Sequence, residues 1–200
     1  RPTMGEIKLA DGTLVTDGMV LSIADLQGLQ YDAPADYLNG QDPGDFIYTV
    51  SDGNSSENFT VDIVVTPVND APTAESKSIT VDEESGDTAI GLTLPSDPDG
   101  DALTITITDV PNVGSVKTSA GTVLSIGDTV TAGQLAALVY EAPEDYTAGV
   151  DPGELTYSVD DGVTATTGLV DIIVNPINDA PVTYTKSISV GENSTDNIVG

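Results

Sequence analysis

The chain has 200 residues, of which 33 are acidic and 5 are basic, and it contains neither histidine nor cysteine. Its net charge of −28 repels the phosphates of nucleic acids and of anionic membranes, so we exclude nucleic acid as a partner. No apolar run approaches the roughly 18 residues of a membrane span, which argues against direct membrane insertion. Acidic side chains that repel one another need a counter-charge, which bound cations supply most simply.

The sequence repeats itself at a spacing of domain size. "PVNDAP" at 67–72 returns as "PINDAP" at 176–181, an offset of 181 − 72 = 109 residues. At this offset, 38 of 91 positions are identical between residues 1–91 and 110–200. In chain order we expect residues 1–70 to be the C-terminal part of one repeat, residues 71–179 a complete repeat and residues 180–200 the start of the next. The chain is expected to be a cut from a longer tandem array.

Strand patterns follow one another along the complete repeat. After an opening strand around Ile79 and Val81, short strands are expected at 103–108, 113–116, 123–126, 155–159 and 169–174. A turn or so of helix is expected within 131–140, and Asp, Gly, Pro and Asn mark the turns. Roughly seven strands in about 100 residues indicate an all-β fold of tandem immunoglobulin-like β-sandwich domains. An open barrel is the alternative.

Acidic residues gather at four turns of this repeat and at its closing linker. They are Glu83-Glu84, "DPDGD" (97–101), "PEDY" (143–146), "DDG" (160–162) and Asn178-Asp179. Calcium takes about six to eight oxygen ligands, so scattered acidic turns can converge on one ion. Segment 97–101 lacks the frame of an EF-hand loop. Taken singly, each cluster is equally typical of a solvated turn.

In this order, the clusters resemble the calcium motifs of cadherin repeats, and more closely the bacterial cadherin-like tandem repeats of large secreted, RTX-type adhesins. The segments "GQLAALVYEAPEDY" and "DPGELTYSVDDG" are similar to the bacterial version. The resemblance implies a cadherin-like sandwich with Ca²⁺ as its cofactor. The positions that match the motif are Glu83, Asp97 with Asp99 (and Asp101 in the same turn), Glu144 with Asp145, Asp160 or Asp161, and Asn178-Asp179 with Pro181.

The same resemblance implies a ligand set for each of two joints. For the joint at 66–72 the set is Asp36, Asn69, Asp70, Asp97, Asp99 and Asp160 or Asp161. For the joint at 175–181 the set is Glu83, Glu144 or Asp145, Asn178 and Asp179, with the remaining acids beyond residue 200. The linkers depart from the cadherin pattern, because Ala71 and Ala180 replace the last Asn and no acid leads. This departure implies fewer or weaker ions at each joint.

The linker pattern indicates a structural function. Pro67 and Pro72 stiffen the chain, and an ion shared between two domains removes the hinge freedom of a bare linker. We expect a calcium-stiffened spacer, stalk or filament module of an extracellular or cell-surface adhesin-like protein. Its partners are adjacent repeats of the same chain or further copies in a filament.

Two other function classes compete with the spacer. A glycan- or peptide-binding module is the alternative, although the chain has no Trp, two Phe and seven Tyr, of which six recur at the repeat offset. An enzyme is not expected, because without His or Cys the usual base for a nucleophile is missing. A carboxylate pair for glycoside hydrolysis stays open in principle, but no apolar or aromatic cleft is visible.

The incomplete repeats carry a prediction of their own. Residues 1–70 lack counterparts of the opening strand, the 97–101 turn and the 103–108 strand, so we expect open strand edges and half a core that neighbouring polypeptide fills. In residues 180–200, Ile188 and Val190 match Ile79 and Val81 and predict an opening strand. That segment leaves 39 − 21 = 18 positions (92–109) without a counterpart, so simple head-to-tail completion by another copy does not restore a domain.

Overall fold

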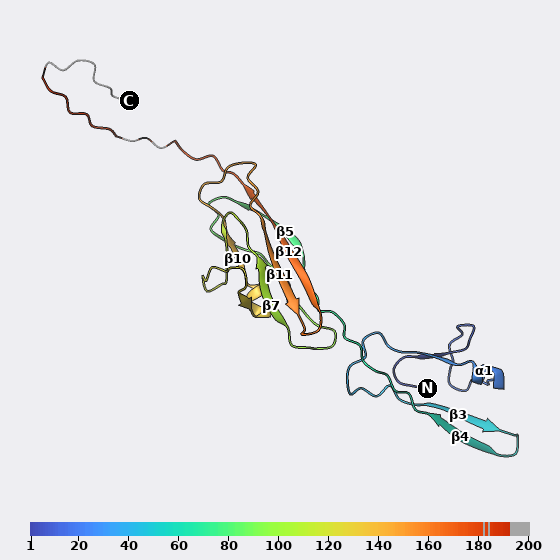
Figure 1. Ribbon diagram of the computed structural model, residues 1–200. Helices are drawn as coiled ribbons and strands as arrows, with labels where there is room; N and C mark the ends of the chain where they lie inside the picture. Colours follow the sequence, from blue (N-terminus) through green and yellow to red (C-terminus); the bar gives the residue numbers. More distant parts are fainter. Residues whose placement is uncertain (182, 184, 193–200) are drawn as a thin grey trace.

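The computed structural model describes residues 1–181, 183 and 185–192 and shows a chain drawn out lengthwise (Figure 1). An N-terminal region, residues 1–65, is joined through the linker 66–72 to a β-sandwich of residues 73–175. Beyond β12 the described residues lead away from the sandwich. In the part that the structure describes, no helix is long and apolar enough to cross a membrane. The predicted all-β fold class is confirmed.

Two sheets form the sandwich. One has five strands in the order β5-β12-β11-β7-β9, and the other has three in the order β6-β10-β8. Paired strands are antiparallel except β5 and β12, which run parallel with Ile79 opposite Ile172. The elements are β5 (Lys77–Asp82), β6 (Asp87–Ala89), β7 (Thr104–Asp109), β8 (Ser115–Lys117), β9 (Thr129–Val130), α2 (Ala132–Ala136), β10 (Val139–Glu141), β11 (Glu154–Asp160) and β12 (Ala165–Asn175).

Alternation of apolar and polar residues fills the space between the two sheets. Successive side chains of a strand point to opposite faces, so every second residue of the long strands reaches the core. Fully burying such a side chain stabilises the fold by about 1.5–3 kcal/mol. On β11 and β12 these inward residues are Leu155, Tyr157, Val159, Val170, Ile172 and Val174, all buried.

Two tyrosines of this core reach loop carbonyls with their hydroxyls. Tyr140 donates to the carbonyl of Val113 at 2.7 Å, and Tyr157 donates to the carbonyl of Glu75 at 2.7 Å. Burial raises the pKa of Tyr140 to about 12. The ring of Tyr157 lies across Gly168, where an added Cβ would be 2.3 Å from Cζ of the tyrosine. The core therefore requires a glycine at this position of β12.

The turn or so of helix expected within 131–140 is confirmed as α2. Thr131 caps α2, because its hydroxyl accepts from the backbone N–H of Gln134 while the Gln134 side chain accepts from the N–H of Thr131. Leu135 on this turn is fully buried. After residue 136 the chain turns into β10, a strand of the smaller sheet that no sequence pattern predicted.

The N-terminal region repeats these elements at the offset of 109 residues but builds smaller sheets. The pairs are β1 (Glu6–Lys8) with β2 (Gln30–Asp32) and β3 (Phe46–Ser51) with β4 (Ser56–Val61), and the helix is α1 (Ile23–Gln27). They correspond to β8, β10, β11, β12 and α2. No strand takes the places of β5, β6, β7 and β9 in the described residues, so each sheet has two strands. The buried cluster consists of Ile7, Val15 and Phe46 with half-buried neighbours.

Two strand predictions were wrong, for a shared physical reason. Segment 123–126 makes a single bridge between Val123 and Lys117 rather than a strand. Residues 185–192 form no strand, and Ile188 and Val190 are exposed. The residues at 182, 184 and 193–200 of the predicted third part lie outside the described residues. A strand pattern becomes a strand where a neighbour supplies hydrogen bonds, and β5 has such a neighbour in β12.

Candidate metal centre

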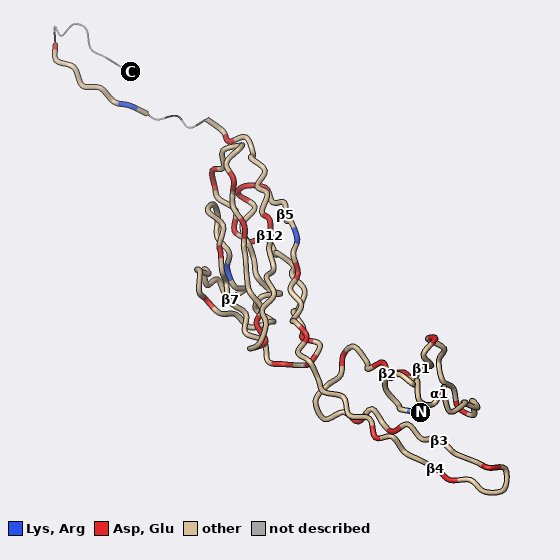
Figure 2. Tube along the Cα trace, turned by 45° about the vertical axis from the view of Figure 1, so that its right-hand side comes forward, with Lys and Arg blue, Asp and Glu red and all other residues tan. Residues whose placement is uncertain are grey.

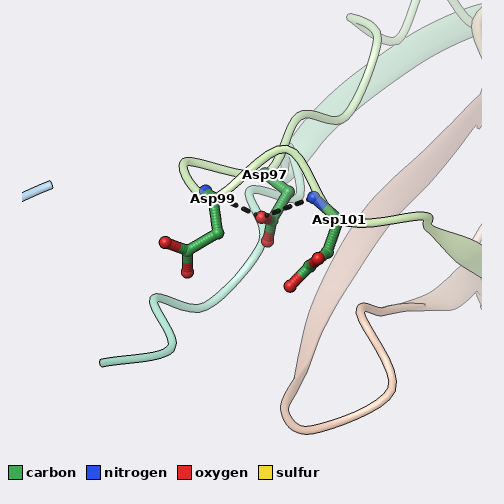
Figure 3. A group of neighbouring side chains, drawn as sticks. All are labelled: Asp97, Asp99 and Asp101. Atoms are coloured by element: carbon green, nitrogen blue, oxygen red, sulfur yellow. Dashed lines mark hydrogen bonds between the residues drawn. The ribbon is translucent and has the colours of Figure 1, made fainter. Parts of the chain in front are cut away.

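The turn at 97–101 folds around the side chain of its first aspartate. Oδ1 of Asp97 accepts hydrogen bonds from the backbone N–H groups of Asp99 at 2.9 Å and Asp101 at 3.1 Å (Figure 3). The Asp97 carbonyl accepts from the N–H of Gly100, whose φ of 80° favours glycine. Asp97 thus closes a compact loop that aims the side chains of Asp99 and Asp101 to the same side.

Three carboxylates meet at this turn. Asp97, Asp99 and Asp101 each offer an oxygen within 4.8 Å of the other two, and no other carboxylate trio among the described residues is as close. The second oxygen of Asp97, Oδ2, is buried and is the one buried side-chain oxygen or nitrogen without a hydrogen-bond partner in the described part of the chain. A buried anionic oxygen is costly unless a donor or a cation compensates it. The turn therefore offers the oxygen ligands of a cation site, together with clustered negative charge that a cation would compensate.

The linker and the β11–β12 hairpin close around this turn. The backbone N–H of Asp70 donates to Oδ2 of Asp99 at 2.7 Å. The amide of Asn69 donates to Oδ2 of Asp161 at 3.0 Å and to the hydroxyl of Thr164 at 3.3 Å. Three segments that are far apart in the sequence are therefore joined at the linker end of the sandwich. In Figure 2, acidic residues colour the loops at this end.

The hairpin residue Asp161 is held as a carboxylate by its neighbours. Its Oδ1 accepts from the backbone N–H groups of Val163 at 2.7 Å and Thr164 at 2.6 Å. These bonds, the one from Thr164 first, and then the amide of Asn69 lower the pKa of Asp161 well below its usual value. Asp161 therefore stays charged at the joint, where it adds to the negative potential beside Asp97, Asp99 and Asp101.

The joint after β12 is built around a different buried carboxylate. Glu83 is 1% exposed, and its two oxygens accept from the backbone N–H groups of Tyr146 and Ile177. It thereby fastens both the 143–146 loop and the outgoing linker to the end of β5. The amide of Asn178 donates to the carbonyl of Asp179 at 3.1 Å, the bond that Asn69 makes to Asp70 at 3.1 Å. The two linkers therefore share this local hydrogen bond.

Comparison with known protein families matches residues 69–173 to the bacterial Ig domain. The chain belongs to this family. No curated protein matches the chain. Among solved structures, an endo-fucoidan hydrolase of glycoside hydrolase family 107 is 18% identical with a TM-score of 0.31, over 87% of this chain and 26% of that one. This chain therefore spans about a quarter of that enzyme's length.

Membership in the family broadens the class indicated by the motifs. A bacterial Ig domain is a structural module of a kind common in surface and extracellular proteins. The match supports a bacterial Ig-like repeat in general, a broader class than the cadherin-like repeats of RTX-type adhesins. It begins at Asn69, so the two linker residues that contact the 97–101 turn and the hairpin, Asn69 and Asp70, lie within the matched span.

The bacterial Ig domain brings together most of the set predicted for the 66–72 joint. Asn69, Asp70, Asp99 and Asp161 are linked by hydrogen bonds, and Asp97 and Asp101 complete the carboxylate trio. Asp160, the alternative to Asp161, points its carboxylate to the N–H of Gly162 within its own hairpin turn. Asp36 is exposed and is not part of the trio.

The set predicted for the 175–181 joint is not gathered in the described residues. Glu144, Asp145, Asn178 and Asp179 are exposed, and no trio of carboxylates forms around Glu83 in the described part. Glu83 itself is occupied as a hydrogen-bond acceptor for two backbone groups. The sequence did not predict this role of Glu83, nor the contribution of Thr164. The Thr164 hydroxyl accepts a hydrogen bond from the Asn69 amide and donates one to Oδ2 of Asp161 at 2.9 Å. A threonine three residues after an aspartate in a hairpin is the signal that could have shown it.

Proposed function

We propose that this chain is a spacer from the stalk or filament of an extracellular adhesin-like surface protein, and that calcium stiffens the joint between its domains. One observation supports the metal above all others. Oδ2 of Asp97 is buried without a hydrogen-bond partner inside a group of three carboxylates. The family supports the broader part of the proposal, a module of a surface or extracellular protein.

The donor set favours calcium over softer metals. The trio offers oxygens alone, and calcium prefers carboxylate and carbonyl oxygens at about 2.3–2.6 Å with an adaptable geometry. Asp97, Asp99 and Asp101 would hold the ion, with further oxygens from the linker or from water. A divalent cation there replaces repulsion among three like charges with attraction to one centre.

Charge at the turn is coupled to the stiffness of the joint. Asp99 contacts both the trio and the backbone of Asp70, so an ion that fixes the Asp99 carboxylate also fixes the linker. Asn69 fastens the same linker to Asp161 on the hairpin. Without the ion, repulsion among the carboxylates pushes the turn open and weakens the linker's attachment. The spacer would thus be rigid where calcium is abundant, as it is outside cells.

A spacer accounts for the composition as well. A spacer has a structural role and would have no catalytic activity of its own. Its partners would be the adjacent repeats. The chain offers no histidine or cysteine to act as base or nucleophile. The strongly acidic surface keeps such a chain soluble and extended, and it gives calcium many weak sites in addition to the trio.

Calorimetry of the 1–200 chain in calcium and in chelator tests the proposal. An ion that binds the folded joint at 100 times its dissociation constant adds about 2.7 kcal/mol to the free energy of unfolding, so the melting temperature should rise in calcium. Asp97→Asn should abolish the rise. Asp151→Asn is the matched control, because Asp151 is an exposed turn aspartate that also accepts a backbone N–H, from Gly153 at 3.0 Å, away from the joint.

Two further measurements separate binding from stiffening. Metal analysis of the purified chain should find calcium, and small-angle scattering should show a narrower range of domain arrangements in calcium than in chelator. Melting curves that coincide with and without calcium would refute the metal part of the proposal. Calcium-dependent melting with unchanged scattering would refute the stiffening.

A further inference from the structure

The loop that follows β2 carries the one Asn-Gly step of the sequence, Asn39-Gly40. The step lies in a tight turn, because the backbone N–H of Gln41 donates to the carbonyl of Leu38 at 3.2 Å. Gly40 has a φ of 85°, in the left-handed region that glycine adopts without strain. Asn39 and Gly40 are both exposed. The side-chain amide of Asn39 and the backbone nitrogen of Gly40 are therefore neighbours in a turn that is open to water.

The hydrogen bonds that close this turn do not use the peptide group between Asn39 and Gly40. The Gln41 side chain accepts from the N–H of Leu38 at 2.9 Å, and the Gln41 carbonyl accepts from the hydroxyl of Tyr37. Within the described part of the chain, neither the N–H of Gly40 nor the side chain of Asn39 makes a hydrogen bond. Space surrounds the step as well, since a Cβ added at Gly40 would meet nothing within 4 Å.

We propose that Asn39 is a site of spontaneous deamidation. The backbone nitrogen of Gly40 loses its proton to water and attacks Cγ of Asn39, so that a new C–N bond forms. The bond from Cγ to the side-chain nitrogen breaks, and this nitrogen takes up a proton and leaves as ammonia. The resulting cyclic succinimide then adds water at one of its two carbonyl carbons and opens to aspartate or to isoaspartate. Water is the only co-reactant.

The glycine determines which asparagine reacts. A side chain on the following residue hinders the approach of its backbone nitrogen to Cγ, and glycine has no such side chain. Asn58 offers the opposite case, because it precedes Phe59 and lies in β4, where pairing with β3 holds the backbone. Its side chain also accepts from the hydroxyl of Thr49 at 2.7 Å. Asn58 is therefore a slow internal reference in the same chain.

The complete repeat contains the same turn with alanine in place of Asn39. At the offset of 109 residues, the step corresponds to Ala148-Gly149. Gly149 has a φ of 88°, and the N–H of Val150 donates to the carbonyl of Thr147 at 3.2 Å. Residues 147–150 are exposed although the sandwich of this repeat is complete. Exposure of the turn is therefore a property of the fold, and it does not depend on strands that the N-terminal region lacks.

Deamidation changes both the charge and the shape of the loop. Asn39 lies between Asp36 and Asp42, so the new carboxylate adds a negative charge to a loop that is already acidic. Isoaspartate also lengthens the backbone by one carbon, inside a turn whose Gln41 carbonyl is bound to the hydroxyl of the buried Tyr37. Because the loss of ammonia is irreversible in dilute solution, the altered loop accumulates with the age of the protein.

Peptide mapping by mass spectrometry tests the proposal on the 1–200 chain, incubated at mildly alkaline pH and body temperature. Asn39 should gain the mass difference between an amide and a carboxyl group on the order of 10-fold faster than Asn58. Both aspartate and isoaspartate should form at this position. Asn39→Ala should abolish the reaction there, and it is a matched control because alanine stands at this place in the complete repeat. Ala148→Asn should create a second reacting turn with a rate close to that of Asn39.

Three outcomes would overturn the proposal. One is a rate at Asn39 no higher than the rate at Asn58. Another is the formation of aspartate without isoaspartate, because the succinimide and the attack by the Gly40 nitrogen would then be wrong. The third is an Ala148→Asn variant that stays intact while Asn39 reacts, which would show that the reaction depends on the surroundings of the N-terminal region rather than on the turn.

Discussion

The two repeats of this chain share their residues at many positions but differ in what lies beside them. Val159 on β11 is 0% exposed, whereas Val50, at the same place on β3, is 51% exposed. Val170 on β12 is likewise buried, and Val61, its counterpart on β4, is exposed. The side chains are identical, so the difference comes from β5, β6, β7 and β9, which are present only in the complete repeat. Burial in this fold is therefore decided by strands that are distant in the sequence.

The largest expected effect tests that difference with one leucine in each repeat. Leu135 on α2 is fully buried, and its counterpart Leu26 on α1 is half-buried. Leu135→Ala should lower the free energy of unfolding of the complete repeat by about 2–5 kcal/mol, because it removes apolar contacts and leaves a cavity. Leu26→Ala should cost clearly less, because solvent already reaches that side chain. Hydrogen exchange of β11 and of β3 reports the two repeats separately, and equal losses would contradict the comparison.

The next effect concerns two glycines of the complete repeat whose counterparts in the N-terminal region carry side chains. Gly168 corresponds to Phe59 and Gly133 to Ala24. Gly168→Ala should destabilise by about 1–3 kcal/mol, since the new Cβ would lie 2.3 Å from the Tyr157 ring. Gly133→Ala is the matched control on α2, where an added Cβ meets nothing within 4 Å. It should stabilise by about 0.5–1 kcal/mol, because alanine loses less backbone entropy in a helix.

Thermal melts of these two variants should shift in opposite directions. If both variants shifted the melting temperature the same way, the close approach of the Tyr157 ring to β12 would be wrong. Phe59→Ala in the N-terminal region should have a small effect, because that ring is 43% exposed and stacks on Tyr48 at a centroid distance of 5.5 Å.

The sequence predicted the strands that carry their own signal. Alternation marked 103–108, 155–159 and 169–174, and each is a long strand of the larger sheet. Alternation failed as a predictor where strand formation depends on a neighbouring strand. Val123 and Ile188 have strand patterns, but neither lies in a strand of the described residues. The short strand β10 was hidden in a helical pattern, because the chain leaves α2 after a single turn.

The candidate site divides in the same way. The short pattern "DPDGD" indicated Asp97, Asp99 and Asp101, because these three residues lie within one turn that is closed by its own hydrogen bonds. The contact of Asn69 with Asp161 spans 92 residues, so the choice between Asp160 and Asp161 depended on the fold. Glu83 was expected to bind metal, and its burial against two backbone N–H groups depends on loops that no local pattern places.

The third prediction compares the hairpin aspartates of the two repeats. Backbone N–H groups lower the pKa of Asp52, that of Ser55 first, and they do so at Asp161, where Asn69 adds a further donor. The pKa of Asp161 should therefore lie below that of Asp52 in an NMR titration of the carboxyl carbons. Asn69→Ala should raise the pKa of Asp161 toward that of Asp52 and leave Asp52 unchanged.

The sign of the pH dependence follows from these shifts. A folded-state pKa below the ordinary value of 3.8 means that Asp161 stabilises the fold above pH 3.8 and loses this contribution as the pH falls below it. The joint should therefore loosen in acid before the core of the sandwich does. Equal titration midpoints for Asp52 and Asp161 would show that the linker does not bind the hairpin in solution.

The smallest expected effect concerns a lysine that recurs in both repeats. Lys117 on β8 pairs with Glu141 on β10 at 2.5 Å and with Asp87 on β6 at 3.4 Å, so it spans the three strands of the smaller sheet. Lys8 on β1 pairs with Asp32 on β2 at 2.6 Å and otherwise with Glu6 of its own strand. Exposed ion pairs contribute little to the free energy of unfolding. An ammonium group that pairs with two neighbouring strands should contribute more than one that pairs with a single neighbouring strand and with its own.

Lys117→Gln should therefore lower the melting temperature of the complete repeat slightly, and Lys8→Gln should lower the melting temperature of the N-terminal region even less.

The hydrogen bond with Glu141 raises the pKa of Lys117, and the same bond lowers the pKa of Glu141. The pair thus contributes above the ordinary glutamate value of 4.5 and below the ordinary lysine value of 10.5, and its contribution is lost outside that window. A double-mutant cycle of Lys117→Gln with Glu141→Gln, run at low and high salt, isolates the term, which should shrink as salt screens it. A coupling that is the same at both salt concentrations would mean that Lys117 acts through the packing of its stem against β10 rather than through its charge.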